Sequence, residues 1–330
     1  MRDELRPGEV LDERYRLERR LGEGGMGTVW VAHQIALERD VAVKVLHAAS
    51  DEVRPRLRRE ALALAAVHHP AVVQVFDYGE MRAGVPFVVM ELVRGESLAV
   101  RRARGGSFTA EEAVSLVLPL LEGLAAAHQA GVVHRDVKPE NVLLADGPAG
   151  VAPKLCDFGI ARIVRAGAAL STDGGVVGTP AYMAPEQVQG RAVDARTDVW
   201  GAGVLLYELV AGARPFGDDD VFAVMHRVMS DPPPYPRHAR GLDGRLWSIL
   251  MGALRKTPEE RTPSALALHD QLSAWLAARG GAARIVGAQT RSPVSVELTP
   301  TLPAQPEPAP APRDDAPPSI DALIRAKLDG

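Results

Sequence analysis

The pattern of hydrophobic and polar residues along the first third of the chain is mainly that of β-strands. Residues 14–34, RYRLERRLGEGGMGTVWVAHQ, alternate around a cluster of glycines, which predicts a β-hairpin with a glycine-rich turn. The run PFVVMELV at 86–93 is continuously apolar and predicts a buried strand that ends in a polar crossover. We therefore expect a strand-rich small lobe over residues 12–93.

Helical periodicity appears once in this small lobe and dominates after it. Residues 54–67 place Leu57, Ala61 and Leu64 at helical spacing. Residues 94–278 predict a mainly helical large lobe, and several of its helices begin with Thr, Asp or Ser, which can cap free N–H groups. The helices expected there cover residues 109–128, 198–211, 220–230, 242–254 and 264–278.

The composition changes beyond Ala278. Residues 279–318 are rich in Gly, Ala and Pro, cannot form a packed core, and are expected to be a largely disordered linker. Residues 319–330, SIDALIRAKLDG, predict a short amphipathic helix, although isolated helices of this length are marginal in water. A frayed tail and a helix that folds only in a groove, on this chain or on a partner, both remain open.

Charge and cysteine content exclude several classes of protein. The net charge of −4 and the pI of about 6.2 give no sign of a nucleic-acid-binding surface. The single cysteine, Cys156, excludes an internal disulfide framework and fits a reducing cytosol. The charged opening residues lack the apolar segment of a secretory signal, and the most apolar run, 113–133, is too polar to span a bilayer. We expect a cytoplasmic protein without a membrane span.

Two short segments concentrate the candidate chemistry. HRDVKPEN at 134–141 places Asp136, Lys138 and Asn141 within six positions, and KLCDFG adds Asp157 after a predicted hairpin. Carboxylate and amide oxygens on two neighbouring loops suit Mg²⁺, a hard cation that prefers oxygen ligands. Either fragment alone would mean little, but eight contiguous residues followed by DFG form a specific pattern.

HRDVKPEN followed by DFG resembles the catalytic loop and the metal loop of protein kinases. The resemblance implies that Asp136 orients and deprotonates a substrate hydroxyl and that Asn141 and Asp157 hold Mg²⁺ or Mn²⁺. Lys138 is the signature of the serine/threonine class. Thr179, in GTPAYMAPE, supports that class because the family uses it to link the substrate pocket to Asp136 and Lys138.

The glycine cluster resembles the glycine-rich loop of kinases. By itself LGEGGMGTVW is as typical of a flexible turn as of a phosphate site, but VAVK follows on the next predicted strand. Lys44 of VAVK resembles the strand lysine that pairs the α- and β-phosphates of ATP. We expect Glu60, beside the inward stripe of the 54–67 helix, to form an ion pair with Lys44, and Glu52 to lie near the helix start instead.

The segment PFVVMELV resembles the hinge between the two lobes of a kinase. By that resemblance Met90 is the gatekeeper, while the Glu91 carbonyl and the Val93 amide hydrogen-bond adenine; Val29, Ala42 and Leu143 enclose the ring. The ATP-binding residues expected in this way are Leu21, Gly22, Glu23, Gly24, Gly25, Met26, Gly27, Thr28, Val29, Ala42, Lys44, Met90, Glu91, Val93 and Leu143.

Further kinase motifs follow in order. Ala184, Pro185 and Glu186 match the APE motif, DVWG at 198–201 matches the segment that anchors the catalytic loop, and Arg261 matches the arginine that pairs Glu186. The resemblance covers residues 12–278 and implies an α+β bilobal protein kinase fold, with an N-lobe at 12–93 and a C-lobe at 94–278. GEGGMGTVW, HHPAVVQVFDYGE and GTPAYMAPEQ indicate the bacterial branch of the Hanks-type serine/threonine kinases.

The glycine-rich segment between DFG and APE resembles an activation loop. Ser171 and Thr172 are its hydroxyls before GTP, and a phosphate there would add about two negative charges that Arg135 could bind. We therefore expect autophosphorylation at Ser171 or Thr172.

Three classes of function could account for these motifs. A serine/threonine protein kinase with protein substrates is the prediction. A small-molecule phosphotransferase would share the nucleotide and metal residues but gives no reason for GTPAYMAPE or Lys138, and a catalytically weak scaffold would show substitutions at Lys44, Asp136 or Asp157, which are all intact. A homodimer, or a partner docked on the tail, is compatible with this prediction.

Overall fold

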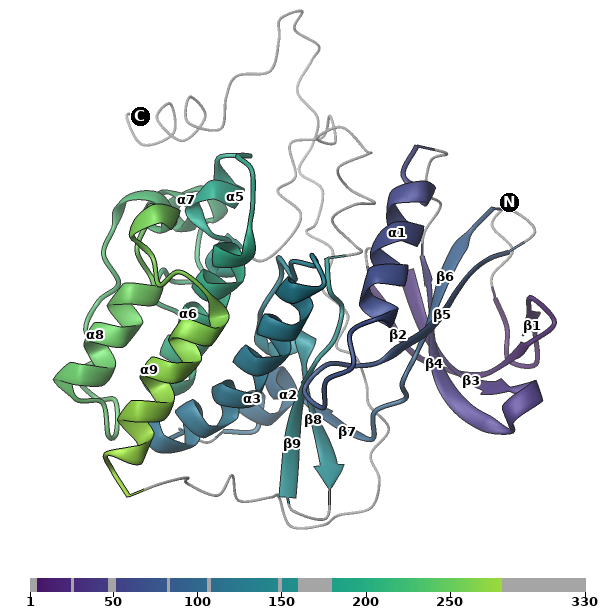
Figure 1. The fold of residues 1–330 in the computed structure, drawn as a ribbon, viewed down its shortest axis with the longest axis horizontal. Helices are drawn as coiled ribbons and strands as arrows, with labels where there is room; N and C mark the ends of the chain where they lie inside the picture. Colours follow the sequence, from purple (N-terminus) through teal and green to yellow (C-terminus); the bar gives the residue numbers. More distant parts are fainter. Residues whose placement is uncertain are drawn as a thin grey trace, which may run out of the picture.

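A strand-rich N-lobe and a helical C-lobe lie side by side in the computed structural model, as the predicted bilobal α+β fold requires (Figure 1). The expected activation-loop residues Ser171, Thr172 and Thr179 lie outside the described residues, and so do Gly25, Met26 and residues 281–330. The structure describes residues 5–24, 27–46, 52–81, 84–105, 108–147, 150–159 and 180–280.

The N-lobe is built on a six-stranded antiparallel sheet with the strand order β1-β2-β3-β4-β6-β5. One face of this sheet buries a cluster that includes Leu17, Trp30, Val43 and Phe87. The strands are β1 (Val10–Leu11), β2 (Tyr15–Gly24), β3 (Gly27–Gln34), β4 (Arg39–Leu46), β5 (Val75–Glu80) and β6 (Pro86–Met90), with a 3₁₀ turn at Ile35–Leu37 between β3 and β4.

Helix α1 (Arg54–Ala65) packs on the sheet beside β5. It buries Leu57, Ala61 and Leu64, the three residues whose spacing predicts the helix. Its C-terminal end lies two residues before the predicted one, at Ala65 rather than at residue 67.

The glycine at the start of β3 is required by its neighbour strand. Gly27 has a φ of 152°, and a Cβ atom there would lie 2.1 Å from the carbonyl oxygen of Val45 on β4. Any side chain would push β3 and β4 apart. Part of the glycine-rich pattern therefore reflects the packing of the hairpin on β4, independently of any ligand.

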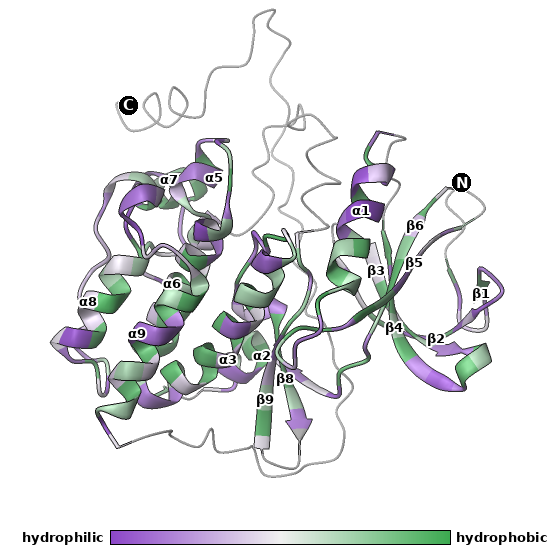
Figure 2. Cartoon of the chain, viewed as in Figure 1, coloured by the Kyte–Doolittle hydropathy of each residue, from purple (hydrophilic) through white to green (hydrophobic). Residues whose placement is uncertain are grey.

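The C-lobe is organised around α6 (Ala195–Ala211), which is buried along almost its whole length and consists mainly of apolar residues (Figure 2). The C-lobe also contains a three-stranded sheet of β7 (Gly95–Ser97), β8 (Val142–Gly147) and β9 (Gly150–Leu155). The HRD segment that begins at residue 134 precedes β8, and the DFG segment that ends at residue 159 follows β9. In the described part of the chain, none of the helices combines the length and the apolar character needed to cross a membrane. The other helices are α2 (Leu98–Ala103), α3 (Ala110–Gln129), α5 (Pro185–Val188), α7 (Val221–Ser230), α8 (Gly244–Ala253) and α9 (Ala265–Ala277), with 3₁₀ turns at Pro139–Asn141, Pro180–Tyr182 and Pro258–Glu260.

Capping side chains decide where these helices begin. Thr109 and Glu112 form a reciprocal capping box on α3, and Ser264 accepts the Ala267 N–H on α9, so both starts agree with the prediction. Helix α6 begins three residues earlier than predicted because Asp194 caps it by accepting the Arg196 N–H at 2.8 Å. The short helices α2 and α5 were not predicted.

A buried ion pair fastens the segment after the expected activation loop to the end of the C-lobe. Arg261 donates to both carboxylate oxygens of Glu186 at 2.9 and 3.0 Å, which confirms the predicted pair. Thr197 adds a hydrogen bond of 2.8 Å to the same carboxylate. Burial opposes ionisation of Glu186, but the hydrogen bonds and charge of Arg261 outweigh it and hold the pKa of Glu186 below its usual value.

We expect Arg261→Met to destabilise the fold by about 3–5 kcal/mol, because it leaves the Glu186 carboxylate buried without its cation. Urea unfolding at neutral pH measures this loss. Because the pKa of Glu186 is lowered by folding, the pair stabilises the protein above the unfolded pKa and this contribution disappears as the pH falls. The difference between wild type and variant should therefore persist from neutral pH down to about pH 4 and narrow below it.

The control is Arg20→Met, which removes an ion pair with Glu23 whose side chains are 57% and 56% exposed. Exposed pairs contribute at most about 1 kcal/mol. An equal loss of unfolding free energy in Arg261→Met and Arg20→Met would contradict a structural role for the buried pair.

Candidate active site

The HRD segment is held by one buried carboxylate from α6. Asp198 accepts the N–H groups of His134 at 2.8 Å and Arg135 at 2.7 Å, and its Oδ2 lies 2.7 Å from Nε2 of His128. Arg135 adopts a φ of 66°, which is uncommon for a residue with a side chain. The two hydrogen bonds fix this turn, and the predicted anchoring of the loop by DVWG is confirmed.

Asp136 follows this turn and is surrounded by polar partners. Its Oδ2 lies 2.8 Å from Nζ of Lys138 and accepts a 2.9 Å hydrogen bond from Nδ2 of Asn141. Burial opposes ionisation, but the charge and the hydrogen bond of Lys138 outweigh it, so the pKa of Asp136 is below its usual value. Asp136 is therefore ionised and can accept a hydrogen bond. Because its low pKa makes it a weak base, any role in accepting a proton depends mainly on its position.

The second loop is tied to the first by its backbone. The Cys156 N–H donates to the Asn141 carbonyl at 2.9 Å, and the Gly159 N–H donates to the His134 carbonyl at 3.0 Å. His134 accepts the Asp136 N–H at Nδ1, so its Nε2 carries the proton that is donated to the Cys156 carbonyl at 3.0 Å. Burial lowers the pKa of His134, which favours this neutral form.

The predicted ion pair between Lys44 and Glu60 is wrong for this conformation. Within the described residues Lys44 pairs with Asp157, its Nζ lying 2.7 Å from Oδ1, whereas Glu60 lies 3.7 Å from the guanidinium of Arg135. A largely buried ammonium needs an anion, and here the Asp157 carboxylate supplies it. Burial raises the pKa of Glu60, and the charges of Arg135 and Arg59 act in the opposite direction.

An apolar pocket lies beside this cluster, between the lobes. The structure brings together seven of the predicted nucleotide residues in its lining: Leu21, Val29, Ala42, Met90, Glu91, Val93 and Leu143. It adds three that were not predicted, Val73, Leu92 and Cys156. The other described residues of the glycine-rich loop are not in the pocket lining and belong to the β2–β3 hairpin. In this hairpin Gly22 is followed by Glu23, which pairs with Thr28, and by Gly24, which pairs with Gly27.

The side chain of Glu91 is fixed behind the hinge by residues that the sequence did not indicate. Its carboxylate lies 2.8 Å from Nζ of Lys154 on β9 and accepts the Gln74 N–H at 3.3 Å. Gln74 in turn donates to the carbonyl of Ala65 at the end of α1. The hinge is thus joined to β9, the strand that ends two residues before Asp157, and to α1. The scarcity of lysine, five in 330 residues, is the one signal that could have pointed to Lys154.

Comparison with known proteins agrees with this arrangement. The family model described as the protein kinase domain matches residues 15–272. The chain belongs to the protein kinase family. The kinase is 42% identical over 273 residues to serine/threonine-protein kinase PknB of Mycobacterium tuberculosis, an alignment that covers 79% of this chain and 43% of the relative.

Two further bacterial relatives show similar likeness to this kinase. Serine/threonine-protein kinase pkn2 of Myxococcus xanthus is 42% identical over 273 residues, covering 80% of this chain and 33% of the relative. Probable serine/threonine-protein kinase PknB of Corynebacterium glutamicum is 38% identical over 272 residues, covering 78% and 41%. The kinase spans less than half the length of these three relatives, and the resemblance to bacterial serine/threonine kinases is confirmed.

Proposed function

We propose that this chain is a serine/threonine protein kinase that transfers the γ-phosphate of ATP to hydroxyl groups of protein substrates, its own Ser171 or Thr172 included. The observation that carries the proposal is the meeting of Asp136, Lys138 and Asn141 with Asp157 on two hydrogen-bonded loops. The names of the bacterial relatives support the same class of reaction.

The pocket accounts for binding of the nucleotide. Val29 and Ala42 on one side and Leu143 on the other enclose an adenine ring by dispersion. The Glu91 carbonyl and the Val93 N–H supply hydrogen bonds to its edge. Lys44, which lies near the pocket, exchanges the Asp157 carboxylate for the α- and β-phosphates.

The donor atoms fit a hard divalent cation. Asp157 offers a carboxylate that already attracts the Lys44 ammonium, and Asn141 uses its Nδ2 on Asp136, which leaves its amide oxygen to face a ligand. We propose that Asp157 and Asn141 hold Mg²⁺ or Mn²⁺, which when bound neutralises charge on the phosphate oxygens.

Asp136 and Lys138 act at the transferred group. Asp136 orients the substrate hydroxyl and accepts its proton as the hydroxyl oxygen bonds to the γ-phosphorus. The bond from that phosphorus to the β–γ bridging oxygen breaks, and ADP leaves with the bonding electrons. The ammonium of Lys138 lies beside Asp136, where it can stabilise negative charge on the transferred phosphoryl group.

We expect Asp136→Asn to lower phosphate transfer to a protein substrate by about 10²–10⁴-fold, since it removes the proton acceptor and keeps the shape. Asp157→Asn and Lys44→Met should reduce transfer to background, because they remove a metal ligand and the phosphate partner. Incubation with labelled ATP and Mg²⁺, followed by phosphoamino acid analysis and mass spectrometry of Ser171 and Thr172, measures these effects.

The control is Asp219→Asn, an exposed carboxylate on the C-lobe that pairs with Arg227 and should keep wild-type activity. Circular dichroism of each variant checks that it is folded. Near-wild-type transfer by folded Asp157→Asn would refute the metal assignment, and phosphate found only on tyrosine would refute the serine/threonine class.

The Lys44–Asp157 ion pair generates a separate prediction for the nucleotide-free protein. Lys44→Met removes an ammonium ion next to a proposed metal ligand, so Mn²⁺ should bind at least about threefold more tightly without nucleotide. Titration followed by electron paramagnetic resonance measures the affinity.

The matched control is Lys154→Met, which removes a lysine that pairs with Glu91 instead. Its Mn²⁺ affinity should equal that of the wild type. Unchanged or weaker Mn²⁺ binding by Lys44→Met would show that the two cations do not compete for Asp157.

A further inference from the structure

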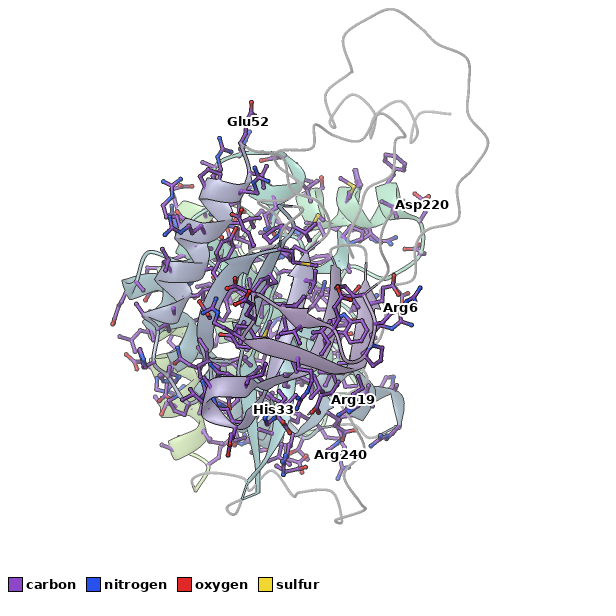
Figure 3. The ribbon with its side chains drawn as sticks, turned by 90° about the vertical axis from the view of Figure 1, so that its right-hand side faces the viewer. Arg6, Arg19, His33, Glu52, Asp220 and Arg240 are labelled. Atoms are coloured by element: carbon purple, nitrogen blue, oxygen red, sulfur yellow. The ribbon has the colours of Figure 1, made fainter. Side chains whose placement is uncertain are left out.

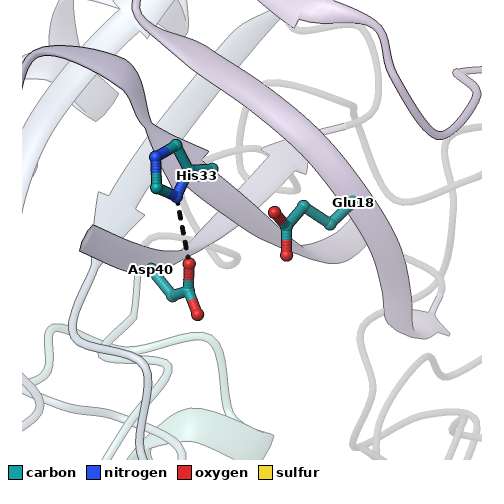
Figure 4. A group of neighbouring side chains, drawn as sticks. All are labelled: Glu18, His33 and Asp40. Carbon is teal, nitrogen blue, oxygen red and sulfur yellow. Dashed lines mark hydrogen bonds and ion pairs between the residues drawn. The ribbon is translucent and has the colours of Figure 1, made fainter. Parts of the chain in front are cut away.

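Three neighbouring strands of the N-lobe sheet bring a carboxylate, an imidazole and a second carboxylate together (Figure 4). His33 on β3 lies directly opposite Asp40 on β4. Glu18 comes from β2, where the pairing with β3 shifts register between Leu17 and Arg19. Glu18 is thus the extra residue of a β-bulge, a feature that redirects a side chain.

The cluster lies on the same face of the sheet as the nucleotide pocket but shares no residue with the pocket lining. Alternation along β3 and β4 places His33 and Asp40 on the same face as Val31 and Ala42, one pleat further from the glycine-rich turn. His33 lies at the surface of the N-lobe, where Figure 3 labels it. None of the catalytic, metal or nucleotide residues assigned above belongs to the cluster.

The distances suit a small cation. One ligand atom from each of the three residues lies within 4.8 Å of the others, and Nδ1 of His33 is 3.3 Å from Oδ1 of Asp40. Two ligands bound tetrahedrally to zinc at about 2.0–2.2 Å are about 3.4 Å apart. His33 and Asp40 therefore already have the separation of two zinc ligands, and a carboxylate oxygen of the exposed Glu18 lies within 4.8 Å of both.

The donor types select the metal. One imidazole nitrogen with two carboxylates suits Zn²⁺, whereas Mg²⁺ and Ca²⁺ prefer six or more oxygen ligands. The two carboxylates together balance the charge of a divalent ion. All three residues come from hydrogen-bonded strands, so little backbone order must be gained on binding.

We propose that Glu18, His33 and Asp40 form a Zn²⁺ site that ties β2, β3 and β4 together, with water at the fourth position. Bound zinc stabilises the folded state, since the unfolded chain does not hold the three ligands together. The site stands independently of the proposed phosphotransfer.

Zinc binding to the full chain tests the proposal. Isothermal titration with Zn²⁺, in a large excess of Mg²⁺ to occupy the oxygen sites, should show one site that His33→Ala weakens by at least about tenfold. Asp40→Asn should also weaken it. Zn²⁺ should raise the melting temperature of the wild type and leave that of His33→Ala unchanged.

The control is His238→Ala, which removes an exposed histidine of the C-lobe and should keep wild-type zinc affinity. Substituting Co²⁺ gives a spectroscopic check, because the absorption of a tetrahedral Co²⁺ ion should appear in the wild type and disappear in Asp40→Asn. Absence of a one-to-one site, equal affinity in His33→Ala and wild type, or displacement of Zn²⁺ by the excess Mg²⁺ would each overturn the proposal.

Discussion

The buried carboxylate of Asp198 is the constraint on which the catalytic loop depends. It comes from α6, the most deeply buried helix of the C-lobe, and accepts the backbone N–H groups of both His134 and Arg135. Two such hydrogen bonds hold Arg135 in a left-handed conformation that a side chain otherwise disfavours. Asp136 therefore has a defined position. Hydrogen bonds made by His134 and Gly159 also hold the DFG segment against the HRD segment.

Two ion pairs join the lobes. Lys44 holds Asp157, and Arg135 holds Glu60, so each of the two lobes contributes one charge to each pair. In the proposed mechanism, phosphates that bind Lys44 displace Asp157, whose carboxylate is then available to hold a metal. The proposed kinase mechanism therefore begins with an exchange of partners, in which the anion beside Lys44 changes.

Much of this structure could be predicted from sequence because local signals are strong. The apolar spacing of Leu57, Ala61 and Leu64 reveals the buried face of α1, and the caps Thr109 and Ser264 mark the starts of α3 and α9. The candidate site follows from contiguous motifs, whose order along the chain fixes the residues. Motifs identify residues, however, and do not identify the conformation, which is why the Lys44–Glu60 pair was predicted and Lys44–Asp157 was found.

Contacts between residues that are far apart in the chain could not be predicted from the sequence. Glu91 and Lys154 are 63 positions apart, and nothing local to either predicts their ion pair. Cys156 is buried in the pocket wall, and its place there depends on how β9 meets the hinge. Such contacts require the register of whole strands and lobes.

The most direct test of the central claim, that one buried carboxylate positions the catalytic loop, is the transfer rate of Asp198→Asn relative to its ATP affinity. Asparagine keeps the shape and one acceptor oxygen but loses the charge-assisted bonds to His134 and Arg135. We predict that the folded variant binds ATP like the wild type, since the pocket residues are unchanged, and transfers phosphate at least about 100-fold more slowly. A transfer rate near that of the wild type would contradict the account.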